Sequence, residues 1–224
     1  MYRYETHLHT LPVSKCARVG VRENLEFYKD LGYDGVFITN HFIDGNTDIV
    51  NLPTYETQIE AYFSDYEEGL QIGRELGISV FCGVEMSYGG TDFLVYGLDR
   101  AWYLAHPQIM QMKKSEELAL LAECGALIIQ AHPFREAHYI DHIRLFPRHV
   151  HGVEVTNACR TEFENCMAEL YAKEYDLIPI AGSDNHIGAR QTHLAGMCAS
   201  TPIVDEADFV ARVKARQMEI FTLP

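Results

Sequence analysis

Four apolar segments of the chain each end directly in residues that can bind a metal ion. The segments cover residues 35–39, 78–84, 126–131 and 177–182, and the residues that follow them are Asn40-His41, Glu85, His132 and Ser183-Asp184-Asn185-His186. Short runs rich in β-branched and aromatic residues are typical of buried parallel strands. Because single imidazole or carboxylate groups are costly to bury, their repetition at strand ends predicts that they converge on one site at a shared rim.

His7-Leu8-His9 adds two imidazoles near the start of the chain. Side chains two positions apart face the same side of a strand, so a strand over residues 4–9 would present both rings to one divalent cation. Taken alone, such a pair is more often two unrelated histidines of a half-buried strand. Together with the four strand ends, the pair favours a polynuclear metal site.

Helix-like segments alternate with these strands. The predicted helices cover residues 22–31, 62–76, 115–124, 161–175 and 205–216. This alternation predicts an α/β chain of β/α units, and the length of 224 residues suits a single domain over residues 1–224. Residues 42–64 are polar and weakly periodic, which predicts a loop or short lid over the metal site.

Five motifs, in order along the chain, resemble the signature segments of the PHP (polymerase and histidinol phosphatase) superfamily. They are His7-Leu8-His9, Thr39-Asn40-His41, Gly83-Val84-Glu85, Ala131-His132-Pro133-Phe134 and Gly182-Ser183-Asp184-Asn185-His186. Residues 154–157, with the sequence Glu-Val-Thr-Asn, are also similar to the segment that this family carries before its final Asp-x-His. The resemblance implies a distorted (β/α)7 TIM-like barrel, a two- or three-metal cluster at its mouth, and often phosphoesterase activity.

The resemblance also implies which residues share each metal, with Glu85 bridging two of them. The three ligand sets are His7, His9, Glu85 and Asp184; Glu85 and His132; and His41 and His186. Histidine combined with carboxylate suits Zn, Mn and Fe alike, so we expect two or three divalent ions without a choice among these metals.

Three positions depart from the family pattern. Residues 12–16 read Pro-Val-Ser-Lys-Cys where members carry an Asp or a His, so the third metal is left open. Cys16 could supply a thiolate, which fits zinc better than manganese, although a lone cysteine is more often simply buried. Asp92 stands where many members have a ligand His and could bind metal or cap a turn. Asn40 stands where Asp is common and would position His41.

A metal cluster of this kind predicts hydrolysis of a phosphate ester, because it lowers the pKa of a bound water and neutralises phosphoryl oxygens. We therefore expect a phosphoric monoester hydrolase, similar to histidinol phosphatases, in which Glu85, Asp184 and Arg135 act in catalysis. Two alternatives stay open. One is a different metallohydrolase with amidohydrolase-like chemistry, and the other is a metal-binding regulatory module of the PHP type.

Cationic side chains near the ligands are candidates for binding the phosphate. Arg135 lies three residues after His132, and Arg18 and Lys15 follow His9 as weaker candidates. Further weak candidates are Arg160 and Arg190. A metal-bound water or His138 would protonate the leaving alkoxide, although His138 is more simply interpreted as a surface residue.

The composition narrows the partners and the compartment. Eighteen basic against 32 acidic residues give a formal charge of −14, which disfavours extended nucleic acid but permits a small phosphorylated metabolite. No apolar stretch approaches a membrane span, and the N-terminus lacks the pattern of a signal peptide, so we expect a cytoplasmic protein without a membrane partner. The six cysteines form no C-x-x-C pair and lie mostly in apolar segments, which predicts reduced core residues.

Overall fold

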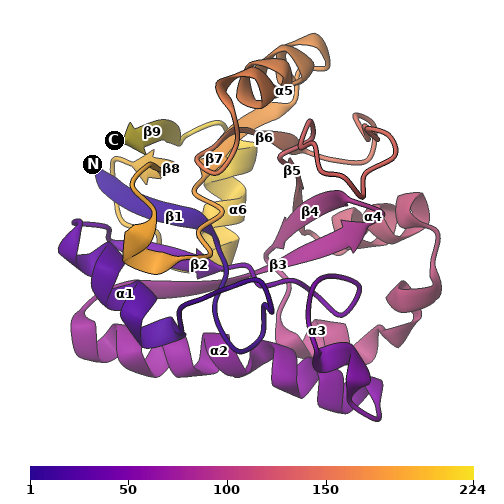
Figure 1. Ribbon diagram of the computed structural model, residues 1–224, viewed down its shortest axis with the longest axis horizontal. Coiled ribbons are helices and arrows are strands. Elements are labelled where there is room, and N and C mark those ends of the chain that lie inside the picture. The colour runs from indigo at the N-terminus through magenta and orange to yellow at the C-terminus, as the bar shows by residue number, and fades with distance from the viewer.

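The computed structural model describes residues 1–224 and contains one mixed sheet of nine strands that curls into a nearly closed barrel (Figure 1). The spatial order of the strands is β7-β6-β5-β4-β3-β2-β1-β8-β9. Their bounds are β1 (Tyr2–Leu8), β2 (Gly35–Ile38), β3 (Ser79–Tyr88), β4 (Thr91–Tyr96), β5 (Leu127–Ala131), β6 (Gly152–Asn157), β7 (Ile178–Gly182), β8 (Leu194–Ala199) and β9 (Glu219–Leu223). The expected α/β barrel is confirmed.

Strand β4 is the source of the distortion, because it runs antiparallel to both of its neighbours while β1–β3 and β5–β7 pair in parallel. It follows β3 through the two-residue turn Gly89-Gly90, whose φ angles of 58° and 88° suit glycine in a tight hairpin. An antiparallel strand begins where its neighbours end. The first residues of β4 therefore lie at the rim formed by the last residues of the parallel strands.

The barrel closes where the end of β7 meets β1. The hydroxyl of Thr6 donates to the backbone oxygen of Ala181 at 2.6 Å. Just beyond, the backbone N–H of His9 donates to Asn185 and that of Asn185 donates to His7, at 3.1 and 3.3 Å. The final strands β8 and β9 extend the sheet from the other edge of β1, in antiparallel order.

Six helices cover the outside and one end of the barrel (Figure 1). They are α1 (Val21–Asp30), α2 (Tyr55–Leu76), α3 (Arg100–Ala105), α4 (Lys114–Glu123), α5 (Glu162–Glu174) and α6 (Glu206–Lys214). The Phe209 ring of α6 packs on Phe37 and Tyr96, with centroids 4.2 and 5.1 Å apart. These contacts fill the barrel end where β4 finishes, which leaves the opposite end for polar side chains. No helix is both long and apolar enough to cross a membrane.

The structure corrects several sequence-based assignments. Helix α2 begins at Tyr55, so the second half of the segment 42–64 is helix rather than loop, because Thr54 and Thr57 cap it reciprocally. Strand β3 continues three residues beyond Glu85, because the hairpin with β4 extends it. Helix α3 and strands β8 and β9 were not predicted. All six cysteines are unpaired, as expected, but only Cys82 and Cys198 are buried.

Candidate metal centre

All eight ligand candidates lie at the rim where the parallel strands end. They are His7, His9, His41, Glu85, Asp92, His132, Asp184 and His186. Seven of them are buried, and His186 is half-buried. Three groups have donor atoms close enough to share an ion, namely His7-Glu85-His132, His7-His9-Asp184 and His9-Cys16-His41-His186.

His7 and His9 turn their Nε2 atoms toward each other at 3.2 Å. On the far side of its ring, His7 Nδ1 lies 2.8 Å from Glu154 Oε1. A carboxylate only accepts hydrogen bonds, so Nδ1 carries a proton and its ring is held with Nε2 toward the site. A carboxylate behind an imidazole in this way is the usual support of a metal-binding histidine.

A chain of hydrogen bonds sets the tautomer of His9. Asn40 Oδ1 accepts from the backbone N–H of Thr10 and from the hydroxyl of Ser14, each at 2.7 Å. Because Ser14 has donated its only proton, its oxygen accepts from Nδ1–H of His9 at 3.0 Å. His9 Nε2 therefore carries a lone pair, and a lone pair facing His7 Nε2 requires a cation or a proton between the two rings.

Glu85 is the centre of the cluster. Its Oε1 lies 3.3 Å from the Nε2 atoms of both His7 and His132. Its Oε2 lies 3.3 Å from His9 Nε2 and 2.7 Å from His41 Nδ1. Neither Oε2 nor His41 Nδ1 forms an aligned hydrogen bond, although both are buried. Two unsatisfied acceptor-capable atoms in contact fit a site built for a cation rather than a finished hydrogen-bond network.

Asp184 completes the ligand set of His7 and His9. Its Oδ1 lies 3.5 Å from His7 Nε2 and 3.4 Å from His9 Nε2. Asp184 and His132 both adopt positive φ, 52° and 25°, which few residues other than glycine do. Local backbone strain of this kind is common where side chains must be aimed into a functional site.

Asp92 lies between His132 and Arg135. Its Oδ2 is 2.8 Å from Arg135 Nη2 and 3.9 Å from His132 Nε2, without an aligned hydrogen bond. The carboxylate reaches this rim because β4 is antiparallel and begins there. Asp92 can therefore serve either as a ligand beside His132 or as the anionic partner of Arg135.

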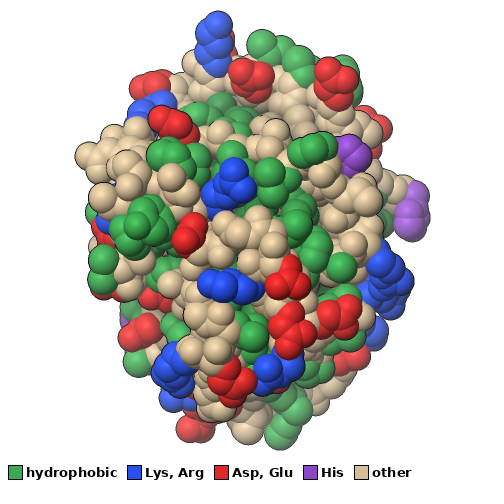
Figure 2. All heavy atoms as spheres, turned by 90° about the vertical axis from the view of Figure 1, so that its left-hand side faces the viewer, with side chains coloured by type: hydrophobic (Ala, Val, Ile, Leu, Met, Phe, Trp, Pro, Cys, Tyr) green, Lys and Arg blue, Asp and Glu red, His purple; other side chains and the backbone are tan.

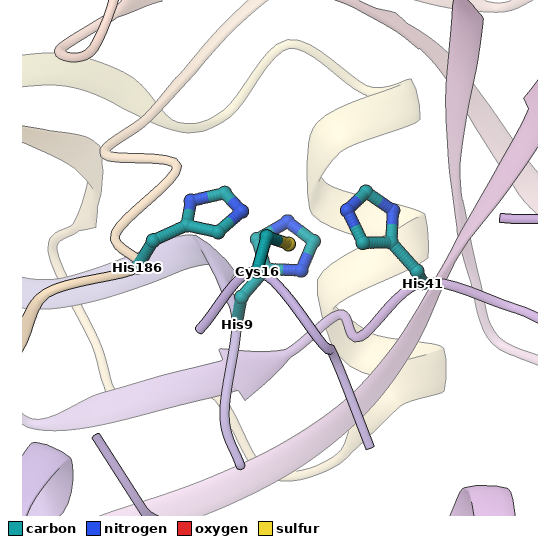
Figure 3. Close-up of side chains that lie close together, drawn as sticks. All are labelled: His9, Cys16, His41 and His186. Carbon is teal, nitrogen blue, oxygen red and sulfur yellow. The ribbon is translucent and has the colours of Figure 1, made fainter. Parts of the chain in front are cut away.

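His41 and His186 stand on the other side of His9, with Cys16 among the three rings (Figure 3). The rings of His9 and His186 stack with centroids 4.2 Å apart, and His41 lies 4.5 Å from His9. His186 Nδ1 is 2.8 Å from the backbone oxygen of Asp184, which can only accept. Its Nε2 is therefore free to bind an ion.

Burial and neighbouring charges compete in setting the pKa values of the site. Burial would raise the pKa of Glu85 and of Asp184, but the surrounding imidazoles hold both well below the usual range. Burial lowers the pKa of His7 and His41, and the carboxylates outweigh it and raise both. Burial and the adjacent rings keep the pKa of His9 well below its usual value. The carboxylates thus stay ionised and attract positive charge into the cluster.

A cavity of about 770 Å³ opens onto the ligands. Arg135 and Arg160 line it, as do Gly45 and Asn46 of the predicted lid. Lys15 pairs instead with Asp48 at the surface at 2.8 Å.

Three other predicted side chains lie outside the lining of this cavity. Arg18 is exposed, His138 lines a separate pocket with Arg135, and Arg190 lies in the 3₁₀ turn Gly188–Arg190.

On the face of the molecule shown in Figure 2, Lys and Arg alternate with Asp and Glu and form no continuous basic surface.

Two supporting residues were missed as functional in the sequence. Glu154 had a usable signal, because it opens a segment that is similar to a family motif. Ser14 had none, since its role depends on Asn40, which is distant in sequence. Asn40 was expected to position His41, and it does so only through Ser14, whose oxygen also accepts from the backbone N–H of His41 at 2.9 Å.

No protein-family model matches the sequence, and no curated protein is similar enough to it to count as a relative. Solved structures do match. A two-domain protein from Bacteroides vulgatus that contains a predicted PHP-like metal-dependent phosphoesterase superposes with a TM-score of 0.73 and 14% identity. The match covers 98% of this chain and 64% of that one, so the present chain spans less than two thirds of its length.

Two further structures match along nearly their whole length. A candidate metal-dependent phosphoesterase from Bifidobacterium adolescentis has a TM-score of 0.58 and 13% identity, covering 96% of both chains. An amidohydrolase from Chromobacterium violaceum, with bound sulfate and no metal, gives the same TM-score and identity, covering 96% of this chain and 97% of that one. At such identities the likeness shows the fold. The chain thus has the barrel fold of these PHP-like structures, and its rim carries groups of side chains that could hold metal ions.

Proposed function

We propose that this protein is a metal-dependent phosphoesterase that hydrolyses a small phosphate monoester. The observation that carries the proposal is Glu85, whose two carboxylate oxygens each lie within 3.3 Å of two imidazole nitrogens. A carboxylate so placed is suited to bridge two cations, the arrangement used for phosphoryl transfer to water. The solved neighbours described as phosphoesterases support this choice.

The proposed centre holds two or three divalent ions of Zn, Mn or Fe. The ligand sets are His7, His9, Glu85 and Asp184; Glu85 and His132, with Asp92 as a further ligand; and His41 and His186. When bound, the ions would supply an activated water and neutralise charge on the phosphoryl group.

The protein's own cations would orient the substrate. Arg135 and Arg160 both line the cavity, and the Nε atom of each is buried without a hydrogen-bond partner. Guanidinium groups bind phosphate oxygens in a bidentate manner, so these two are the better candidates for holding the substrate. Lys15 and Arg18 are weaker candidates because neither lines the cavity. The partner would be a small phosphorylated metabolite rather than an extended nucleic acid.

Hydrolysis of another bond is the second candidate, because one neighbour with the same fold is described as an amidohydrolase. The same neighbour was solved with sulfate, a tetrahedral oxyanion like phosphate. Both reactions would use the same donor set, so the ligands do not discriminate between them. Substrate profiling does.

The test combines metal analysis with an activity assay. Purified protein is analysed for bound metal and assayed on an aryl phosphate with added Mn²⁺ or Zn²⁺, then again after chelation. Two or more metals per chain, with hydrolysis lost on chelation, are expected. Bound metal with hydrolysis only of aryl esters or amides would favour the second candidate, and bound metal without any turnover a regulatory module. Protein that binds no metal would overturn both hydrolase proposals.

A further inference from the structure

Cys16 lies outside the ligand sets proposed above, yet its thiol stands among three imidazoles. Donor atoms of Cys16, His9, His41 and His186 all lie within 4.8 Å of one another, and Figure 3 shows the sulfur directed toward the rings. His9 and Cys16 lie seven residues apart after β1, whereas His41 and His186 come from distant parts of the chain, so the barrel fold brings the group together. A sulfur atom in such a group is placed like a ligand.

The loop that carries Cys16 is anchored on both sides of it. After Cys16, the backbone N–H of Arg18 donates to the backbone oxygen of His186 at 2.7 Å. Before it, the backbone N–H of Lys15 donates to Asn46 at 3.0 Å, and the hydroxyl of Thr47 donates to the backbone oxygen of Val13 at 2.7 Å. Upstream, the hydroxyl of Thr10 donates to the buried carboxylate of Asp65 at 2.6 Å. The position of the thiol is therefore held by buried hydrogen bonds rather than by a free surface loop.

Two neighbours of the thiol independently indicate a ligand. His186 has its Nδ1–H committed to the backbone oxygen of Asp184, which leaves the Nε2 lone pair free. His41 is more than nine-tenths buried, and its Nδ1 forms no aligned hydrogen bond, although Glu85 Oε2 lies 2.7 Å away. His9, in contrast, is engaged at both nitrogens, by Ser14 at Nδ1 and by the Glu85 and Asp184 carboxylates at Nε2. The side chains near the sulfur that keep a ring nitrogen without an aligned hydrogen bond are thus His41 and His186.

We propose that Cys16 is the sulfur ligand of a metal position completed by His41 and His186, and that this position takes Zn²⁺ in preference to Mn²⁺ or Mg²⁺. Thiolate with imidazole suits zinc, whereas the harder cations prefer oxygen ligands. Three protein ligands leave a fourth position for water or substrate, as catalytic zinc sites do. The inference rests on the metal centre of the proposed function but not on phosphate hydrolysis.

Cobalt substitution tests the sulfur ligand directly. Protein freed of metal by chelation is refilled with Co²⁺, and its absorption spectrum is recorded. We expect a near-ultraviolet sulfur-to-cobalt charge-transfer band that Cys16→Ser abolishes. The matched control is Cys159→Ser, because the Cys159 thiol lies at the same rim, 3.3 Å from the backbone oxygen of Asp184, but outside the donor group. This control should keep the band. A band that is missing in the unaltered protein, or that survives Cys16→Ser, would overturn the inference.

Metal competition tests the preference for zinc. With equal Zn²⁺ and Mn²⁺, the unaltered protein should retain zinc at this position. Cys16→Ser should lower the affinity of the position for Zn²⁺ by more than about tenfold, since even residues that only support metal ligands contribute that much to affinity. Cys16→Asp covers the case in which Cys16→Ser fails to fold. It should bind Co²⁺ without the charge-transfer band and show a smaller preference for Zn²⁺ over Mn²⁺ than the unaltered protein. A Cys16→Asp variant whose preference for Zn²⁺ over Mn²⁺ is as large as that of the unaltered protein would refute the assigned selectivity.

The spectrum and the hydrolysis assay fail independently. A sulfur-to-cobalt band in a protein that hydrolyses no phosphate ester would leave the Cys16 site standing and remove the proposed function. Metal-dependent hydrolysis of a phosphate ester, in a protein whose cobalt form lacks the band, would support the proposed function and remove the Cys16 site.

Discussion

Glu85 and Asp184 remain ionised although both are almost completely buried. Burial opposes their charge, and the imidazoles packed around them outweigh it, so both pKa values fall well below the usual range. A buried charge without a partner is strongly destabilising, so the same residues that attract a cation also require one. At the scale of single residues, the site contains more hydrogen-bond acceptors than donors. Hydrogen bonds with Glu154, Ser14 and the backbone hold its side chains in position.

Replacing Glu85 by Gln should reduce hydrolysis by more than about 100-fold, because an amide cannot bridge two cations as a carboxylate does. Metal content should fall with it, while the circular dichroism spectrum stays that of the folded protein. Glu123→Gln, at an exposed position of α4, is the control and should change neither quantity. Full activity in Glu85→Gln would remove Glu85 from its proposed bridging role.

Glu5 lies beneath the metal centre and should make stability depend on pH. Burial raises its pKa from 4.5 to about 7, although the N–H groups of Ser183 and His7 and the Tyr28 hydroxyl donate to it. The folded state therefore binds this proton more tightly than the unfolded state, so the stabilisation is complete below pH 4.5 and is lost as the pH rises through about 7.

The difference between the pKa of Glu5 in the unfolded and in the folded state corresponds to roughly 3 kcal/mol of stability that is lost at high pH. Glu5→Gln, which mimics the protonated carboxyl, should lack this dependence. Urea unfolding of the unaltered protein and of Glu5→Gln, between pH 4.5 and above pH 7, measures how the free energy of unfolding depends on pH. Parallel pH profiles for the two proteins would show that Glu5 does not titrate in this way.

Strand ends are the elements that build the site. Strands β2, β3, β5 and β7 deliver ligands where their apolar runs stop, the end of β1 delivers His7 and His9, and the antiparallel β4 delivers Asp92 from its beginning. The loop after β5 then brings Arg135 back over Asp92, where the two form a close ion pair at 2.8 Å. One reversed strand in the sheet thus places a cation for an anionic substrate beside the metal ligands.

Removing that cation should weaken substrate binding. Arg135→Ala should raise KM for a phosphate monoester by about 10- to 100-fold, the value of one or two charge-assisted hydrogen bonds. The matched control is Arg18→Ala, because Arg18 is exposed and does not line the cavity. Steady-state kinetics of the three proteins test this expectation. Equal KM values for Arg135→Ala and the unaltered protein would exclude Arg135 from substrate binding.

Closure of the barrel depends on Gly182, the last residue of β7. A Cβ atom there would lie 2.5 Å from His7 Cβ and 2.9 Å from Glu154 Oε1. Gly182→Ala should therefore destabilise the fold by about 1–3 kcal/mol and displace His7, with loss of bound metal. At Gly20 an added Cβ would meet only the backbone oxygen of Leu11, at 4.0 Å, so Gly20→Ala is the control. Thermal unfolding and metal analysis of both variants test this prediction. Equal melting temperatures and equal metal contents would show that the close approach of Gly182 to His7 is not required.

Across the whole molecule, one end of the barrel is filled by apolar side chains and the other by ionisable ones. The apolar end, with Phe37, Tyr96 and Phe209 packed together, fixes the barrel independently of any ion. The polar end concentrates part of the net charge of −14 in buried carboxylates. Metal binding would offset that charge, so the stability of the protein should depend on its metals.

Chelation should therefore lower the melting temperature by several degrees without unfolding the protein at 25 °C. A ligand at 100 times its Kd stabilises by about 2.7 kcal/mol, and about 2–4 °C accompanies each kcal/mol in a domain of this size. Thermal scans with excess EDTA and with restored Zn²⁺ or Mn²⁺ provide the measurement. Identical melting temperatures in all three conditions would show that the centre does not bind these ions when folded.

Local patterns predicted much of this architecture. The apolar runs before His41, His132 and Asp184 became β2, β5 and β7, and the five helices predicted from periodicity all formed. These features depend on neighbours within a few residues, where side-chain period and capping act directly. The boundary errors, such as the early start of α2, arose where a Thr-Thr cap replaced the expected pattern.

Contacts between distant residues decided the rest. The direction of β4, the support of His9 by Asn40 through Ser14, and the meeting of Cys16 with His41 and His186 all join parts of the chain that no local pattern relates. A sequence motif names the atoms that can bind a metal, because donor chemistry belongs to each side chain. Which nitrogen points inward, and which donors share one ion, depends on barrel closure and on buried hydrogen bonds, and these exist only once the whole chain is folded.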